Sequence, residues 1–540
     1  MSQVSAQAVP ASGAATSRAA AFAGFRTRWA LLISIAGGAA VYASFPPLDA
    51  WPLAVLGPAL LVLALTGRSL RASFGCGLAF GLALFMPLLS WLLNVAWYAW
   101  FALSVAEAVI FAVLAVGQRL LLRLPGWPVA VAGWWVCVEA LRDRWPFAFP
   151  WGRLAMSQSV APDVRWVAIG GAPLLTFLVA LAGAMLARGI LAWLAAGGRG
   201  RLPVGPTVAA GVTIGLVLAG GLLPADPTGG APTAQVAAIQ GNVPRARNLP
   251  QQLSASQVTQ NHVAATLKLA AQVKAGQRPA PDLVIWPENA TDLDPFQNPG
   301  VYAELSAAVA AIGKPILVGE VLNDPRRNVG QLWVPGRGPT TAYVKRQLVP
   351  FGEYIPFRGI ISSFSSLPSL QPTDFTAGRE PVVFAVGGIK LGDVICYEVA
   401  FDHLVRSEVT AGANLLTVQS NDADFEIDGQ LGETRQQTAM ARIRAVESDR
   451  ALVYVSTTGE STIIAPDGSL IAQSGVWQQA ILDARVPLVS HRTLADRVGA
   501  WPEYVIIMLT VLALAWAVLR ALRSRRDEPG VTRQGRQASE

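Results

Sequence analysis

The sequence predicts an α/β domain of stacked layers attached to an all-α membrane domain of about eight transmembrane helices. Hydrophobic residues make up 52% of the chain and charged residues only 14%, whereas soluble domains carry about 25% charged residues. Apolar runs that approach the roughly 20 residues needed to cross a bilayer recur before residue 225, and one more follows residue 498. Between them, β-rich segments alternate with helical ones, which favours a layered α/β fold.

The chain divides into five predicted parts. Residues 1–25 are Ala- and Ser-rich and predict a disordered cytoplasmic leader, with a signal peptide as the alternative. Residues 26–224 are predicted to form a membrane domain with about seven transmembrane helices, 225–498 an extracytoplasmic domain, 499–521 the last transmembrane helix and 522–540 a basic cytoplasmic tail. The apolar runs lie at 29–46, 51–67, 74–96, 98–118, 127–141, 166–197, 204–224 and 501–520.

The arginines predict the orientation of these helices. If the N-terminus is cytoplasmic, every inside segment carries arginine, whereas the opposing loops at 46–49 and 94–98 carry no basic residue. Positive residues prefer the cytoplasmic side, so both termini are expected to be cytoplasmic in a multi-pass protein of the plasma (inner) membrane. The inside arginines are Arg18, Arg26, Arg28, Arg68, Arg71, Arg119, Arg123, Arg199, Arg201, Arg520, Arg523, Arg525, Arg526, Arg533 and Arg536.

One outward loop, 142–165, breaks this pattern because it holds four arginines, Arg142, Arg144, Arg153 and Arg165. One interpretation is a structural loop whose arginines pair with Asp143 and Asp163. The other is contact with phospholipid headgroups, since arginine binds phosphate with two parallel hydrogen bonds.

Charge and cysteine content exclude two classes of function. The net charge is +7, yet residues 229–498 hold 22 basic and 25 acidic residues, so the basic excess lies in and beside the apolar runs and no nucleic-acid partner is expected. Cys76, Cys137 and Cys396 form no CxxC pattern and no disulfide framework. No metal or other cofactor is expected.

The α/β part is predicted from its apolar runs. Helical patterns cover Gln251–Ala275, Val301–Ile312 and Thr434–Arg450. The predicted strands are Ala234–Ile239, Leu283–Trp286, Pro315–Val318, Gln331–Val334, Val382–Val386, Leu391–Cys396, Leu415–Gln419, Leu452–Ser456 and Ser461–Ala465.

Three segments of this part are each expected to be a strand that ends on a reactive side chain: Glu288, Lys345 and Cys396. A thiolate is a strong nucleophile, and a nearby ammonium lowers the pKa of a thiol. A carboxylate acts as general base, and an ammonium near the attacked carbonyl stabilises the oxyanion. The set suffices for acyl transfer without a metal. A lone cysteine on an apolar strand is more often a core residue, but the matching contexts of Glu288 and Lys345 favour catalysis.

The motifs around these residues resemble the nitrilase superfamily and, within it, the bacterial apolipoprotein N-acyltransferases. They are Gln240-Gly-Asn-Val-Pro244, Trp286-Pro-Glu288, Lys345-Arg-Gln-Leu-Val-Pro-Phe-Gly-Glu353-Tyr-Ile-Pro356, Cys396-Tyr-Glu398, Ser420-Asn-Asp422 and Met440-Ala-Arg-Ile-Arg-Ala-Val-Glu447. The resemblance covers roughly residues 28–520. It implies a four-layer α-β-β-α nitrilase-like sandwich for the catalytic domain.

The resemblance also implies an activity: transfer of an acyl chain from a phospholipid to the α-amino group of the diacylglyceryl-modified cysteine of an apolipoprotein. The partners would be these two substrates and membrane lipid, and we expect a monomer. Cys396 would form a thioester, Glu288 act as general base and Lys345 stabilise the oxyanion. Supporting positions are Glu353, Tyr397 and Glu398.

Two departures from the family pattern concern aromatic residues. Many members carry a Trp shortly after the Gln-Gly-Asn motif, where this chain reads Arg245-Ala-Arg-Asn-Leu-Pro250, and the aromatic residue after Ser-Asn-Asp is displaced to Phe425. The apolar stretch Ile355–Leu370, with Phe357 and Phe364, is expected to be a mobile lid facing the membrane rather than an ordinary loop.

Two alternatives to an acyltransferase remain. A membrane-bound nitrilase-type amidase or hydrolase would need only a single anchor, so eight spans argue against it. A transporter or receptor with an inactive nitrilase-like sensor domain would not need Glu288, Lys345 and Cys396 together.

The arginine distribution predicts the outcome of a topology experiment. A reporter fused after Pro224 should report an extracytoplasmic position, and one fused after Arg526 a cytoplasmic one, in paired alkaline phosphatase and fluorescent-protein fusions. The opposite pair of results would show that the number of spans is wrong.

Overall fold

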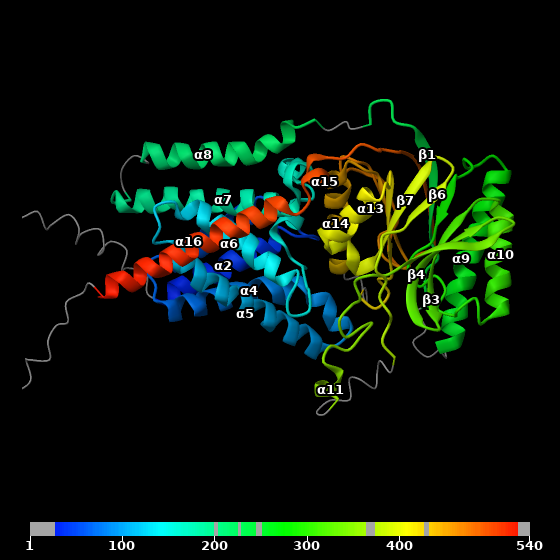
Figure 1. The fold of residues 1–540 in the computed structure, drawn as a ribbon, viewed down its shortest axis with the longest axis horizontal. Helices are drawn as coiled ribbons and strands as arrows, with labels where there is room; N and C mark the ends of the chain where they lie inside the picture. The colour runs from blue at the N-terminus through cyan, green and yellow to red at the C-terminus, as the bar shows by residue number, and fades with distance from the viewer. Residues whose placement is uncertain are drawn as a thin grey trace, which may run out of the picture.

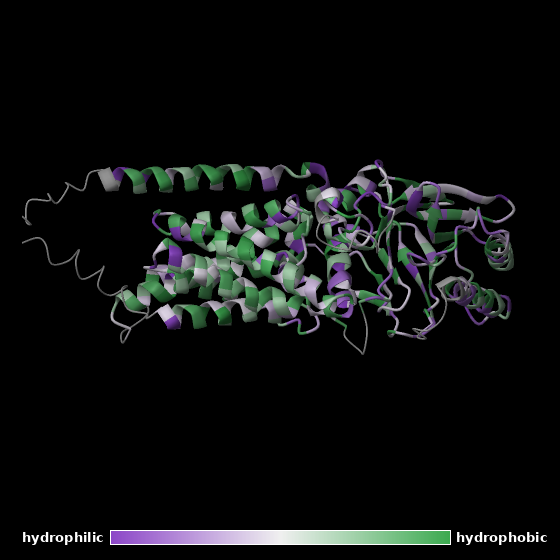
Figure 2. Cartoon of the chain, turned by 90° about the horizontal axis from the view of Figure 1, so that it is seen from below, coloured by the Kyte–Doolittle hydropathy of each residue, from purple (hydrophilic) through white to green (hydrophobic). Residues whose placement is uncertain are grey.

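The computed structural model describes residues 27–198, 203–224, 228–244, 251–362, 373–425 and 431–526. An elongated group of helices leads into an α/β part (Figure 1). The helices of the first part are mostly apolar along their length, as Figure 2 shows. The predicted leader at 1–25, the inside arginines Arg199 and Arg201, and most of the predicted tail lie outside the described residues.

Five helices of the described residues are long and apolar enough to cross a membrane. They are α4 (Leu70–Leu88), α5 (Trp97–Leu121), α7 (Val167–Ala195), which continues the turn from Pro162, α8 (Val204–Leu218), which continues to Leu222, and α16 (Trp501–Arg526). Three shorter helices accompany them: α2 (Thr27–Ala43), α3 (Leu53–Leu65) and α6 (Trp127–Arg142). All eight coincide with the predicted apolar runs.

Helices α4 and α5 pack closely because glycines of α4 face α5. A Cβ atom on Gly81 would lie 2.6 Å from the Cα of Ala108, and one on Gly77 would lie 2.5 Å from the carbonyl oxygen of Phe111. Real Cβ atoms do not approach so closely, so only glycine permits this spacing. Small residues at such contacts let helices associate without a hydrophobic driving force.

The α/β part contains two six-stranded sheets. The first has the order β12-β1-β2-β3-β4-β5 and the second β11-β10-β9-β8-β7-β6. The first sheet comprises β12 (Ala480–Pro487), β1 (Thr233–Gln240), β2 (Leu283–Ile285), β3 (Ile316–Asn323), β4 (Arg326–Val334) and β5 (Gly338–Val344). The second comprises β11 (Leu470–Gln473), β10 (Thr462–Ile464), β9 (Leu452–Ser456), β8 (Leu415–Ser420), β7 (Ile389–Ile395) and β6 (Val383–Val386).

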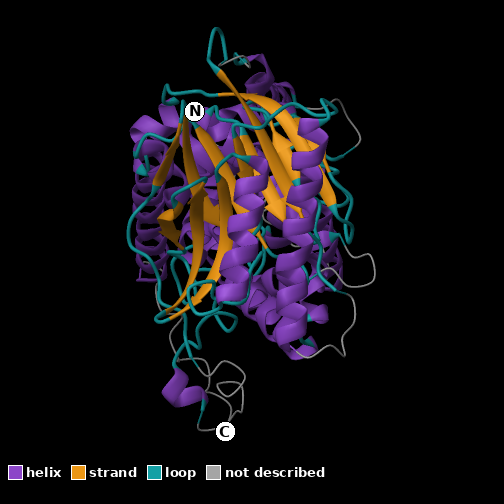
Figure 3. Ribbon diagram, turned by 90° about the vertical axis from the view of Figure 1, so that its right-hand side faces the viewer, coloured by secondary structure: helices purple, strands orange, loops and turns teal. Residues whose placement is uncertain are grey.

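Helices cover the outer faces of both sheets. Helices α9 (Gln251–Lys274) and α10 (Pro299–Ile312) cover the first sheet, and they lie in front of the strands in Figure 3. Helices α13 (Asp402–Thr410) and α14 (Gly432–Ser448) cover the second sheet on the side of the helical part (Figure 1). The order of layers is therefore α-β-β-α, as the sequence predicted, and the buried hydrophobic core of this part includes Leu317, Leu391 and Val418.

All nine predicted strands are present, and β5 is the strand that was expected to end at Lys345. The sequence missed β11 and β12 together with α13. These elements carry polar or charged residues at several positions, as in β12 (Ala-Ile-Leu-Asp-Ala-Arg-Val-Pro). Strand β11 is largely exposed, so its side chains give no buried pattern. β12 forms because its backbone pairs antiparallel with β1 along the full length of that strand.

The arginines of the loop at 142–165 pair with carboxylates of the chain, which favours the structural interpretation. Arg142 pairs with Glu107 of α5, and Arg144 with Glu503 of α16 at 2.8 Å. Arg165 pairs with Asp449 at 2.9 Å. The expected pairing with Asp163 is wrong for the described residues, because Arg165 reaches across to the α/β part instead.

Arg153 connects the two parts of the molecule through a buried cluster of charges. Its guanidinium lies 2.8 Å from Asp402 at the start of α13 and 3.4 Å from Asp143. Arg444 of α14 contacts the same Asp402 carboxylate at 2.6 Å. Burial alone would raise the pKa of Asp402, but Arg153 and Arg444 outweigh it and hold that pKa below its usual range.

Arg153→Met should destabilise the protein, because it leaves the buried carboxylates of Asp143 and Asp402 short of positive charge. Breaking a buried pair in this way costs about 3–5 kcal/mol. Thermal unfolding in detergent micelles measures the loss. Arg278→Met is the matched control, since Arg278 pairs with Asp483 but is 31% exposed, and exposed pairs contribute about 0–1 kcal/mol. Equal melting temperatures of the two variants would contradict the structural role of Arg153.

Candidate active site

Cys396 lies directly after β7, at the first position of a short turn, η5 (Cys396–Ala400). Its φ angle is +51°, a left-handed conformation that non-glycine residues adopt rarely and at a cost. The residue is 8% exposed. The strained turn therefore points the only cysteine of the α/β part away from the regular run of β7.

Glu398 fixes this turn from within. Its carboxylate accepts hydrogen bonds from the backbone N–H groups of Ile395 (2.7 Å), Arg346 (2.7 Å) and Gln347 (2.9 Å), and from the hydroxyl of Tyr343 (2.8 Å). These bonds tie the turn after β7 to the segment that follows β5. Glu398 thus positions the Cys396 and Lys345 segments relative to each other.

Lys345 and two carboxylates form a buried cluster. The Nζ atom of Lys345 lies 3.0 Å from an oxygen of Glu288 and 3.0 Å from an oxygen of Glu353. Glu288 follows β2 and Lys345 follows β5, so parts of the first sheet that are not neighbours bring these groups together. The other oxygen of Glu288 accepts a hydrogen bond from the backbone N–H of Asn421 at 3.0 Å.

Asn328 belongs to the same cluster, although no sequence motif predicts it. Its amide donates to Glu288 at 2.6 Å and to Glu353 at 3.0 Å. It lies inside β4, where one polar residue in a strand carries no recognisable pattern. The Asn328 amide and the Lys345 ammonium therefore contact the same two carboxylates.

Tyr397 faces the helical part instead of the cluster. Its hydroxyl donates to the backbone carbonyl of Ala148 at 2.6 Å. Its ring stacks on Phe149 and Trp151 of the same loop, with centroids 6.3 and 6.4 Å apart. The residue after Cys396 therefore fixes the α/β part against the loop that follows α6.

The displaced aromatic residue Phe425 extends this junction. Its ring lies 5.1 Å from that of Trp91, and its carbonyl accepts a hydrogen bond from Asn94 at 2.6 Å. The segment Arg245–Pro250, where the family pattern has a Trp, lies outside the described residues.

Comparison with known proteins decides the family. The model of the apolipoprotein N-acyltransferase N-terminal domain matches residues 37–185, and the carbon-nitrogen hydrolase model matches 235–496. An apolipoprotein N-acyltransferase from Mycolicibacterium smegmatis is 37% identical over 91% of this chain and 85% of that protein. One from Azotobacter vinelandii is 32% identical over 92% and 96%, respectively. The chain belongs to the apolipoprotein N-acyltransferase family. The resemblance seen in the motifs is thereby confirmed, and the protein is an acyltransferase.

Among solved structures, an amidase from Nesterenkonia sp. is 19% identical, covers 49% of this chain and 92% of that one, and has a TM-score of 0.35.

The electrostatics of this N-acyltransferase keep the resting thiol neutral. Burial raises the pKa of the Cys396 thiol, the Glu288 carboxylate raises it further, and Lys345 opposes both without reversing them. Burial also raises the pKa of Glu288. Burial disfavours the Lys345 ammonium, but Glu288 and Glu353 outweigh it and raise the pKa of Lys345. Lys345 therefore does not lower the pKa of the Cys396 thiol enough to offset burial and the Glu288 carboxylate.

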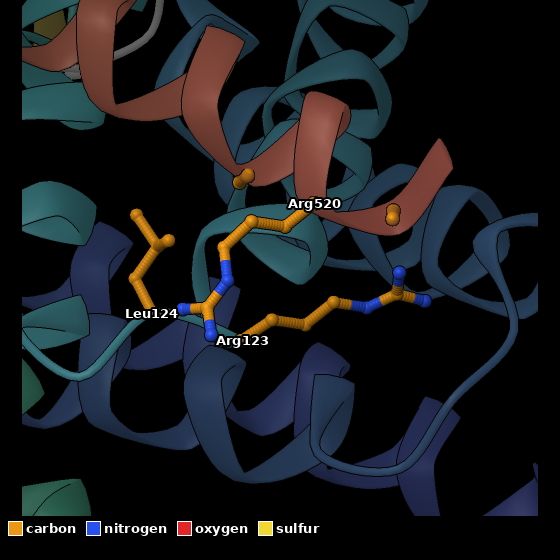
Figure 4. Close-up of a pocket in the computed structure, with 5 residues that line it drawn as sticks. Arg123, Leu124 and Arg520 are labelled. Atoms are coloured by element: carbon orange, nitrogen blue, oxygen red, sulfur yellow. The ribbon is translucent and has the colours of Figure 1, made fainter. Parts of the chain in front are cut away.

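Outside this cluster, the described residues contain a cavity but no candidate metal site. Within the described residues, no group of three His, Cys, Asp or Glu side chains is placed to hold a metal ion. A cavity of about 200 Å³ lies between the α5–α6 turn and α16, lined by Arg123, Leu124, Ala517, Arg520 and Ala521 (Figure 4). It lies toward the ends of α5 and α16 that point away from the α/β part (Figure 1), so it is remote from that part.

Glu288→Gln should separate thiol reactivity from acyl transfer. The change removes a negative charge that raises the pKa of Cys396, so iodoacetamide should alkylate the thiol faster near pH 8. Acyl transfer should fall about a hundredfold or more, because the general base is lost. In the unaltered enzyme, alkylation should keep rising above about pH 9, since a thiol with a raised pKa ionises only there.

Mass spectrometry of the alkylated peptide measures this rate in a Cys76→Ala/Cys137→Ala background. Asp483→Asn, which removes a carboxylate remote from the thiol, is the control. Slower alkylation in Glu288→Gln than in the control would contradict the proposed effect of Glu288 on Cys396.

Proposed function

We propose that this enzyme transfers an acyl chain from a phospholipid to the α-amino group of the diacylglyceryl-cysteine of an apolipoprotein, as the last step of lipoprotein maturation. The observation that carries the proposal is the position of Cys396. The charges of Glu288 and Lys345 act on its thiol, and the next residue, Tyr397, contacts the loop after α6. The nucleophile is thus placed where the α/β part meets the apolar helices, within reach of lipid.

The first half-reaction forms a thioester. Glu288 accepts the proton of the Cys396 thiol as the sulfur attacks the ester carbonyl of the phospholipid. Lys345 stabilises the oxyanion of the tetrahedral intermediate, since its ammonium is already desolvated and fixed. When the intermediate collapses, the C–O bond breaks and Glu288 returns the proton to the oxygen of the departing lysophospholipid.

The second half-reaction resolves the thioester. The α-amine of the lipid-modified cysteine attacks the thioester carbonyl, and Glu288 accepts a proton from the nitrogen. The C–S bond then breaks, the amide is released, and the thiolate of Cys396 recovers its proton from Glu288. The two substrates react in turn at one nucleophile, which is a ping-pong mechanism.

The membrane arrangement belongs to the same proposal. We propose about eight transmembrane helices, because α2 and α3 are apolar, and α6 coincides with a predicted apolar run and packs against α7 and α16. The arginine distribution supports cytoplasmic termini, an extracytoplasmic domain at 225–498 and residence in the plasma (inner) membrane. The protein acts as a monomer without a cofactor. Both of its substrates then lie in the outer leaflet, beside the catalytic domain.

The segment after the Lys345 motif is proposed to act as a lid. Phe357 is 66% exposed, and its ring lies 6.2 Å from that of Phe147 in the loop after α6. Phe351 lies 5.8 Å from the same ring. An apolar cover of this kind excludes water from the thioester. The rest of the proposed lid, including Phe364, lies outside the described residues.

A labelled phospholipid tests the proposal. Purified enzyme should acquire label through a hydroxylamine-sensitive bond on Cys396, and Cys396→Ser should lose turnover. Free fatty acid should form slowly until a diacylglyceryl-modified peptide with a free α-amine is added, which should accelerate turnover at least about tenfold and yield an amide. Chromatography of the labelled products measures both.

Phe357→Ser should raise the share of hydrolysis, whereas Phe296→Ser, an exposed phenylalanine of the α/β part outside the proposed lid, should not. If free fatty acid remains the main product at saturating acceptor, the site is that of a nitrilase-type hydrolase.

A further inference from the structure

Helix α14 places an amide against the nucleophile. The Nε2 atom of Gln437 lies 3.6 Å from the Sγ atom of Cys396, within hydrogen-bond distance for sulfur. Gln437 is 1% exposed, and Cys396 is buried as well. Within the described part of the chain, Gln437 is the residue whose side chain forms a hydrogen bond with the Cys396 sulfur.

The orientation of the amide follows from its other partners. The Nε2 atom also donates to the carboxylate of Glu433, one turn earlier on α14. The Oε1 atom lies 3.2 Å from the hydroxyl oxygen of Ser420, whose hydroxyl group also donates to Asp422 at 2.7 Å. A flipped amide would turn its oxygen toward the Glu433 carboxylate, and two acceptors would then face each other. The N–H group therefore points toward the sulfur.

We propose that Gln437 is a further catalytic residue, which donates a hydrogen bond to the Cys396 sulfur whenever the sulfur carries negative charge. This inference rests on the proposed role of Cys396 as nucleophile. The charge develops twice: when the thiol loses its proton to Glu288, and when the thiolate leaves at the end of the second half-reaction. Gln437 moves no proton, since an amide is a neutral donor.

The surroundings of the sulfur explain why such a donor matters. Glu288, Glu433 and Asp422 all act on Cys396 as negative charges. Lys345 is the opposing cation, but it already neutralises Glu288 and Glu353 at 3.0 Å each. A buried thiolate in this position is costly unless a donor contacts it. Gln437 supplies that donor from helix α14, whereas Glu288, Lys345 and Glu353 follow strands of the first sheet.

The same contact restrains the thiol proton. Since the Gln437 amide donates to the sulfur, the hydrogen of the S–H group cannot point toward Gln437 and must point away from it. The restraint favours transfer of the proton to Glu288, which acts as its acceptor. Ser420, which orients the amide, begins the Ser420-Asn-Asp422 motif, and Asn421 of that motif donates its N–H to Glu288. One segment therefore positions both the donor and the base.

Alkylation of Cys396 in the Cys76→Ala/Cys137→Ala background tests the inference. Gln437→Met keeps the size of the side chain but loses the donor, and Gln437→Glu replaces the amide by a carboxyl. Each should move the midpoint of the alkylation pH profile upward by about one pH unit, since a hydrogen bond to a charged group is worth at least about tenfold. The rates of thioester formation and aminolysis should both fall about tenfold or more, with little change in KM for the phospholipid.

Thr438→Val is the matched control on the same helix. The Thr438 hydroxyl is buried without a hydrogen-bond partner in the described structure, so this nearly isosteric change should leave the pH profile and both rates unaltered. Thermal unfolding of each variant establishes that the protein is folded.

The outcomes separate the inference from the function on which it rests. If folded Gln437→Met shows the same pH profile and rates as the Thr438→Val control, the donor role of Gln437 is wrong. That result would leave the nucleophile intact, provided that Cys396→Ser is inactive. If Cys396→Ser retains turnover, the proposed function itself fails, whatever Gln437 does.

Discussion

The buried ammonium of Lys345 is the constraint on which the site depends. Two carboxylates, Glu288 and Glu353, lie within 3.0 Å of its Nζ atom, and neither could be buried in ionised form without it. Because the three residues follow different strands or loops, their pairing fixes where β2 and β5 end relative to each other. Asn328 and the N–H group of Asn421 complete the arrangement from β4 and from the segment after β8.

A second set of charges and rings attaches this cluster to the apolar helices. Arg153 and Arg444 share Asp402, and Trp151 donates its indole N–H to Gln436 on α14 at 2.5 Å. The amide of Gln436 in turn donates to the carbonyl of Leu88 at the end of α4. Helix α14 thus contacts the apolar helices through Gln436 and the Cys396 sulfur through the next residue, Gln437.

The sequence predicted those parts of the site that follow strands in recognisable motifs. Glu288 and Cys396 directly follow apolar runs, and Lys345 begins a long motif. Their local structure and their proposed chemistry could therefore both be predicted from the sequence. Asn328 and Gln437 were not, since one lies within a strand and the other within a helix whose polar residues carry no periodic signal. Likewise, the pairing of Arg165 with Asp449 joins residues 284 positions apart, whereas the sequence suggested its near neighbour Asp163. The strand expected before Lys345 is present as β5, but its start was not predicted, because Gly338–Val344 begins with polar and small residues.

The hydrogen bond from Tyr397 to Ala148 has a geometric consequence. Ala148 lies six residues beyond α6, a helix of 16 residues, which corresponds to a length of about 24 Å. The backbone turn that carries Cys396 is therefore held close to the end of helix α6 by this hydrogen bond. The length of α6 then sets how far the thiol lies from the opposite end of that helix. In the proposed reaction, a lipid whose ester group lies at another depth in the membrane must move along the membrane normal to reach the thiol.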